Sequence, residues 1–237
     1  MHRKTDRRRS GWRQFDAIAR RCYLACLLAL ASTAQATTMV YINRCAAGCQ
    51  FSAGVDDSVL NTSSVLSSTH NLSAFVHGDA VFNAVVACAS GLLRPFDIAV
   101  TTTEPSPLPH SELVLAGTAA QGGFPVGVAG VAPATCGYVA GAPAFLFVND
   151  FGSDVNGMCW STAFLLGSMA GLEPLYNCPD VMSYLSGCGS KSFRNEESPC
   201  GTFAPEPCLC GGNSRNSFFT MRSVFGAGDL VHANGFE

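Results

Sequence analysis

The first half of the chain contains segments whose apolar residues recur at the spacing of a strand or of a helix. Residues 39–43, "MVYIN", alternate apolar and polar side chains and predict a first strand. The roughly thirty residues that follow are rich in Ser, Thr and Asn, and we expect them to form loop. Residues 78–96, "GDAVFNAVVACASGLLRPF", carry apolar side chains at helical spacing, with Asp79 near the start and Pro95 near the end. This pattern predicts an amphipathic helix.

Short apolar runs and two further helices follow. Three β-rich runs bounded by Pro or Gly predict strands at 97–103, 111–119 and 144–150. Residues 156–170 are apolar almost all round, which predicts a buried central helix. Beyond this helix the chain is rich in Cys, Gly and Pro, and we expect one last helix at 216–226. These elements predict an α+β fold, with a mixed sheet, a backing helix, a central buried helix and a cysteine-rich C-terminal lobe.

The N-terminus has the pattern of a secretory signal peptide. Basic residues precede the apolar run "CYLACLLALAS", and "AQA" at 34–36 is typical of a cleavage site, so we expect cleavage near Ala36. The apolar run is shorter than the roughly 20 residues that span a bilayer. We therefore expect a secreted or periplasmic protein without a membrane span.

The predicted mature chain is one domain with two lobes. The length after the leader suits a single well-buried core. The polar, glycine-containing end of the chain is expected to be a flexible tail. The predicted segments are the signal peptide 1–36, the domain 37–226 with its sheet lobe 37–172 and disulfide-rich lobe 173–226, and the tail 227–237.

Removing the leader changes the charge of the chain. Eight of the fourteen Lys and Arg residues but two of the seventeen acids lie in residues 1–36, so the remainder has six basic and fifteen acidic residues, a formal charge of −9. Nucleic acids and anionic lipid surfaces are bound through basic patches. We therefore expect neither as a partner.

The cysteines of the predicted mature chain are ten in number, which indicates up to five disulfides in an exported protein. A structural zinc site is the rival interpretation for the cluster Cys200, Cys208 and Cys210, although its close C-x-C pair is not the usual knuckle spacing. The oxidising compartment favours disulfides. The candidates are Cys45, Cys49, Cys88, Cys136, Cys159, Cys178, Cys188, Cys200, Cys208 and Cys210.

One long segment resembles a known protease family. Residues 159–189, "CWSTAFLLGSMAGLEPLYNCPDVMSYLSGCG", resemble the active-site segment of metzincin-type zinc metalloproteases, especially a family of secreted bacterial proteins with a cysteine-rich tail. The metzincin motif is H-E-x-x-H-x-x-G-x-x-H followed by a Met-turn. Gly171 matches its glycine and Met182 its Met-turn, and other segments of the chain resemble the family in the same order. The resemblance implies a metzincin-like, zincin-like fold.

The functional positions of this motif hold other residues. Aligning the motif on Gly171 places the first ligand at Phe164, the general base at Leu165, the second ligand at Ser168 and the third ligand at Pro174. We call these residues the four motif positions. A catalytic zinc needs about three protein ligands, and its general base must accept a proton. None of these side chains does either task well. We therefore predict no catalytic residue, no bound metal and no cofactor.

Histidines elsewhere offer little replacement. None lies within thirty residues of the predicted central helix. His110 and Glu112 would share one face of a strand, but a hydrogen-bonded histidine at a strand edge is the simpler interpretation. The histidines that remain after cleavage are His70, His77, His110 and His232.

Three functions are consistent with these features. The leading hypothesis is a secreted, catalytically inactive metalloprotease homologue, a pseudopeptidase, that binds a peptide or protein in a residual groove. The first alternative is an active secreted zinc metalloprotease with non-standard ligands. The second is a structural or adhesive envelope module. An open cleft beside Met182 would favour binding, whereas a cleft plugged by Phe164 and Pro174 would favour the structural role.

Overall fold

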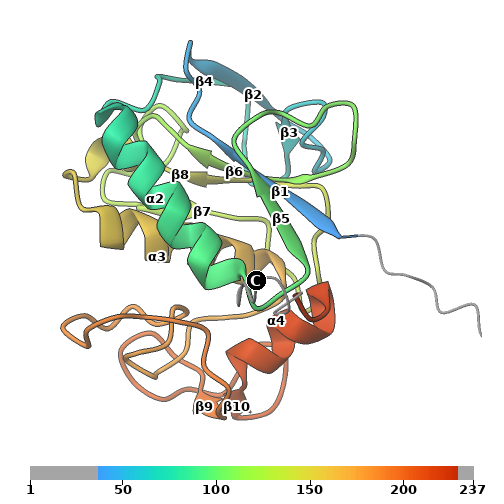
Figure 1. Cartoon of the computed structure of the whole chain (residues 1–237), viewed down its shortest axis with the longest axis vertical. Helices are drawn as coiled ribbons and strands as arrows, with labels where there is room; N and C mark the ends of the chain where they lie inside the picture. The colour runs from blue at the N-terminus through green and yellow to red at the C-terminus, as the bar shows by residue number, and fades with distance from the viewer. Residues whose placement is uncertain (1–36, 229–237) are drawn as a thin grey trace, which may run out of the picture. The chain divides into compact units, whose positions relative to one another are not determined.

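The computed structural model describes residues 37–228 (Figure 1). The predicted signal peptide and residues 229–237 of the predicted tail lie outside the described residues. Within the described residues, no helix is both long and apolar enough to cross a membrane.

A five-stranded mixed sheet forms the centre of the fold, in the order β5-β1-β6-β8-β7 (Figure 1). Four strands are parallel and β7 pairs antiparallel with β8, at the edge. Every residue of β6 and β8 is buried, as expected for central strands covered on both faces. The strands are β1 (Thr38–Asn43), β5 (Ile98–Thr101), β6 (Ser111–Leu115), β7 (Gly130–Val131) and β8 (Pro143–Leu146).

Two long helices cover one face of this sheet. α2 (Gly78–Leu93) and α3 (Val155–Met169) share one apolar core with the sheet side chains that alternate toward them, such as Leu113 and Leu115. The Cys88–Cys159 disulfide joins the two helices. The predicted backing helix and buried central helix are confirmed. The predicted strand at 144–150 is shorter than expected, because Val148–Asp150 turns into the 3-10 helix η1.

The polar segment after β1 is not the loop that its composition predicted. It forms a small sheet of β2 (Cys49–Ala53), β3 (Thr62–Ser63) and β4 (His70–Leu72). This sheet packs on the second face of the central sheet, where the rings of Phe51 and Phe145 meet edge to face at 5.0 Å. The expectation failed because few apolar side chains anchor these strands, and the remaining residues are polar and largely exposed.

The C-terminal residues contain little regular structure apart from a final helix. β9 (Ser198–Pro199) pairs with β10 (Ser214–Arg215), and α4 (Ser217–Phe225) follows. Met221 and Phe225 of α4 join the core that contains β1. The ten cysteines form five disulfides, as predicted: Cys45–Cys49, Cys88–Cys159, Cys136–Cys210, Cys178–Cys188 and Cys200–Cys208. The rival zinc cluster is therefore wrong, because its three cysteines are all bonded to other cysteines.

Candidate functional site

The helix α3 carries three of the four motif positions and has defined ends. Asp154 caps its N-terminus by accepting a hydrogen bond from the Asn156 N–H at 3.1 Å. At its C-terminus, Gly171 adopts a φ of +87°, and the Leu172 N–H donates to the Gly167 carbonyl at 3.0 Å. A Cβ on Gly171 would also lie 3.2 Å from the Gly137 nitrogen. Glycine is therefore required at this position by both backbone conformation and space.

Met182 lies fully buried against α3. A Cβ placed on Gly167 would come within 2.4 Å of the Met182 sulfur, so the missing side chain of Gly167 lets Met182 pack against the helix backbone. The turn that presents Met182 is fixed by Asp180, which is also fully buried. Its carboxylate accepts from the Met182 N–H at 2.8 Å and from the Ser217 hydroxyl of α4 at 2.6 Å. Burial raises the pKa of Asp180, and these hydrogen bonds oppose the rise.

The four motif positions contain no side chain suited to hold zinc. Phe164 is half-buried and meets the Tyr184 ring edge to face at 5.1 Å, and Leu165 is buried. The Ser168 hydroxyl donates to the Phe164 carbonyl at 3.1 Å, inside the helix. The Pro174 carbonyl accepts from the Gly201 N–H at 2.9 Å. These residues do not fit a catalytic metal, and no zinc-dependent step can be derived from them.

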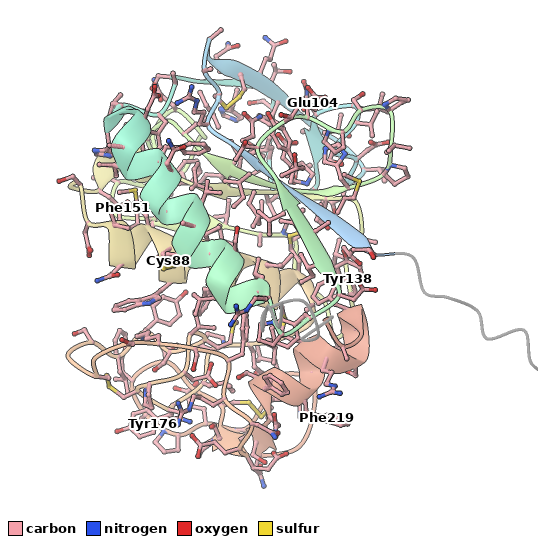
Figure 2. The ribbon with its side chains drawn as sticks, in the orientation of Figure 1. Cys88, Glu104, Tyr138, Phe151, Tyr176 and Phe219 are labelled. Atoms are coloured by element: carbon pink, nitrogen blue, oxygen red, sulfur yellow. A yellow bond between two sulfur atoms is a disulfide. The ribbon has the colours of Figure 1, made fainter. Side chains whose placement is uncertain are left out.

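A cleft of about 1300 Å³ opens beside these residues. Its walls come from α2, α3, the segment before β7 and the loop at 181–191. Cys88 and Phe151, which both line it, lie on the same side of the domain in Figure 2. Pro174 is absent from the described lining, and Phe164 stands in the wall, so the cleft is not plugged. Its large apolar lining residues are Leu92, Val128, Leu146, Phe151, Trp160, Phe164, Leu165, Val181, Tyr184 and Leu185.

The free edge of β7 borders this cleft. The Phe147 N–H donates to the Ala129 carbonyl at 2.9 Å, so the backbone of residue 129 faces β8. Because backbone groups alternate in direction along an antiparallel strand, the N–H and carbonyl of Gly130 point away from β8. Gly130 also lines the cleft. The cleft therefore has an open sheet edge along one side.

Two charged residues line the cleft, Asp154 and Lys191. The Lys191 ammonium group donates a hydrogen bond to the Ser183 carbonyl and is mostly removed from solvent. Burial lowers the pKa of Lys191, and the nearby Asp180 carboxylate opposes this. The cleft is thus chiefly apolar and aromatic, with one buried cation in its wall.

The described histidines lie outside the cleft and are engaged elsewhere. His70 and His77 each bond a backbone carbonyl through a ring nitrogen, at 3.1 and 2.8 Å. His110 does the same with the Leu108 carbonyl at 2.8 Å. The one group of three possible metal ligands among the described residues is Glu173 with Cys200 and Cys208, and these two cysteines are bonded to each other.

Comparison with models of known protein families and with curated proteins finds no match. The sequence indicated the central helix and singled out Met182, which packs beside it, but missed β7 and Tyr184. A two-residue strand beside a glycine gives no periodic signal. Tyr184 gave no sequence signal either, because Val181, Met182 and Ser183 before it are all buried and no periodic pattern marks the residue that becomes exposed.

Proposed function

We propose that this protein is a secreted, catalytically inactive relative of the metzincin metalloproteases that binds an extended peptide in its cleft. The observation that carries the proposal is an open cleft whose wall contains Phe164 and Leu165 where a zinc protease would hold its first ligand and its base. Such a wall can bind apolar side chains but cannot activate water. The expected partner is therefore a peptide that is held and not cut.

The arrangement of elements supports the family relationship. α3 ends at the matched glycine, Gly171, and the matched methionine, Met182, packs directly against that helix. The cleft beside them separates α3 and the sheet edge from the loop at 181–191. A helix, a tight glycine turn and a buried methionine below are what the resemblance implies for the scaffold of a zinc site. Here the scaffold is retained with an apolar surface.

The sheet edge supports binding by strand addition. An extended peptide can pair with exposed backbone groups of an edge strand, while pockets for alternate side chains supply specificity. Gly130 offers outward backbone groups, and its lack of a side chain lets β7 lie close to β8, because a Cβ there would come within 2.7 Å of the Phe145 carbonyl oxygen. The aromatic rings of Tyr184 and Phe164 pack against each other in the cleft wall, where they can contact an apolar side chain of the peptide. We expect alternating apolar residues in the preferred peptide.

The open cleft weighs against the purely structural role. Burying a row of aromatic side chains would stabilise a module with no ligand, yet Tyr184 remains 54% exposed and Phe203, 6.4 Å from it, 73% exposed. Exposed aromatic groups that continue a cleft are typical of recognition surfaces.

Peptide display against the purified, oxidised mature chain tests the proposal. Selected peptides are measured by fluorescence polarisation against the wild type, Tyr184→Ala and Phe219→Ala. Phe219 is a matched control, because it is an exposed aromatic residue on α4 that does not line the cleft (Figure 2). We expect Tyr184→Ala to weaken binding about tenfold, equivalent to about 1.4 kcal/mol, and Phe219→Ala to leave it unchanged.

Catalytic inactivity is measured on the same preparation. Zinc content is determined by mass spectrometry and casein hydrolysis is followed with and without a chelator. Substoichiometric zinc and no hydrolysis support the proposal. Stoichiometric zinc with chelator-sensitive hydrolysis would establish the alternative of an active protease. Equal weakening by both aromatic substitutions, or no selected peptide, would remove the cleft as the binding site.

A further inference from the structure

A second pocket, of about 530 Å³, lies on the sheet face opposite α2 and α3. Glu112 of β6 lines it, and the next side chain on that face, Val114, packs in the core beneath β2 and β4. Tyr41 and Asn43 of β1 contribute from the neighbouring strand. Glu104 belongs to the lining too and lies toward the end of the domain that carries β2 and β3 (Figure 2). No residue of the pocket lines the cleft, so the two sites are separate.

Glu112 has an unmet hydrogen-bonding capacity. Its side chain is 2% exposed, and its Oε1 accepts from the Asn43 amide at 2.7 Å. Its Oε2 is buried and has no hydrogen-bond partner among the described residues. The side-chain oxygen of Asn43, Oδ1, accepts a hydrogen bond from the Cys45 N–H at 2.7 Å. The Asn43 side-chain amide is therefore fixed and holds Glu112 in one position. A buried acid with an unpaired oxygen destabilises a fold unless something binds it.

The charges of the pocket select a cation. Glu104 and Glu112 are its charged residues, and no Lys, Arg or His lines it. The remaining polar lining groups are neutral: Asn43, Gln50, Ser52 and Asn61 with the Tyr41 hydroxyl. Anions are repelled by this set, and apolar ligands gain little from it. The nearest basic residue in the sequence, Arg44, is paired with Asp79.

The size and ligand set favour an organic cation over a metal ion. Calcium takes six to eight oxygen ligands around one point, about 2.4 Å away. Neither acid belongs to a group of three converging metal-ligand side chains within the described residues. The volume also exceeds that of a bare ion. An ammonium group has three N–H donors, which match separate acceptors such as the free Glu112 oxygen and the rim carboxylate of Glu104.

We propose that this pocket binds a protonated primary amine, with its ammonium group on the Glu112 carboxylate and its carbon chain toward the rim. The source of the amine is either a free small molecule or a lysine side chain of a peptide. Both present the same group to Glu112. The proposal is independent of the peptide cleft.

Titration calorimetry of the full mature chain tests this site. The probes are n-butylamine, the amide of Nα-acetyl-lysine, a lysine-containing peptide and, as a neutral control of equal size, n-butanol. We expect saturable binding of the amines alone, weakened at least tenfold by Glu112→Gln and less by Glu104→Gln. Because an ammonium group favours the ionised carboxylate, binding near neutral pH should release protons, seen as a dependence of the heat on the buffer's ionisation enthalpy. Tighter binding of the peptide than of n-butylamine would identify a lysine side chain as the source.

Several results would overturn the proposal. These are equal binding of n-butanol, amine binding that survives both substitutions, or calcium binding that the amines do not displace. Glu112→Gln keeps the shape of the side chain, and circular dichroism checks its fold. If Glu112→Gln does not fold, the amine affinity of the exposed Glu104→Gln variant tests the proposal. An affinity equal to that of the wild type would mean that the amine does not bind in this pocket.

Discussion

Replacing Glu112 with glutamine should change how the stability of the protein depends on pH. Burial raises the pKa of Glu112 from its ordinary 4.5 to about 7, while the Asn43 hydrogen bond opposes the rise and the Glu104 charge adds to it. One pKa unit corresponds to about 1.4 kcal/mol, so ionised Glu112 makes the folded state less stable by about 3 kcal/mol. Glutamine retains the oxygen that accepts from Asn43 and has no charge to bury.

The sign follows from proton binding. Below about pH 4.5 the carboxyl group is protonated in both the folded and unfolded states and its ionisation has no effect. Between 4.5 and about 7 the folded state holds more protons than the unfolded state, so the free energy of unfolding falls as pH rises. Above about pH 7 both states are ionised and the loss is complete. Tyr41, whose pKa is raised to about 12, stays neutral through this window.

Guanidinium unfolding of the oxidised wild type and Glu112→Gln, at several pH values from about 4 to about 8.5, measures the effect. We expect the free energy of unfolding of the variant, relative to the wild type, to rise by about 3 kcal/mol across this range. The buried glutamine amide changes the free energy of unfolding of the variant by the same amount at every pH, so it does not affect this rise with pH. A difference that does not vary with pH, or that falls as pH rises, would refute the reasoning. Glu104→Gln, at the exposed rim, should show a much smaller change.

Three further outcomes test the cleft scaffold. Asp180→Ala should lower the free energy of unfolding by about 2–4 kcal/mol, measured by denaturant titration, because it leaves the Met182 N–H and the Ser217 hydroxyl without their acceptor. Gly171→Ala should lower it by about 1–3 kcal/mol through backbone strain, whereas Gly152→Ala, where a Cβ meets nothing, should change little. Introducing the metzincin ligands and base at the four motif positions should give a variant that binds one zinc ion in equilibrium dialysis, whereas we expect no zinc to bind the wild type. A folded variant that binds no zinc would count against the proposed family relationship. That variant carries Phe164→His, Leu165→Glu, Ser168→His and Pro174→His.

The central elements could be predicted because their patterns are long and periodic. The helix at 78–96 and the buried helix at 156–170 correspond to α2 and α3 within a few residues. Cysteine number and the expected export indicated disulfides but not their partners, since pairing depends on where distant segments meet. Cys136 and Cys210 are 74 residues apart and have no local signal that connects them.

The parts that sequence reasoning missed lack periodicity or depend on tertiary contacts. β3 and β7 have two residues each, too few to show alternation, and their positions are set by the strands they pair with. His110 and Glu112 were predicted to share a strand face, but β6 begins at Ser111, so His110 lies just before the strand. The buried environment of Glu112 was not predicted. Its burial arises from the small sheet formed by the segment that composition predicted to be loop.

The sharing of one core by β1 and α4 has a consequence for how the chain acquires its structure. Val40 and Phe225, near opposite ends of the described chain, pack in the same apolar cluster as α3. Contacts between such distant segments form late, because closing long loops is entropically costly. Until α4 has been synthesised, the part of this core where Phe225 packs against Tyr138 stays uncovered and open to aggregation. If the protein is exported as proposed, its export should depend on chaperones that protect a nearly complete but still unfolded chain.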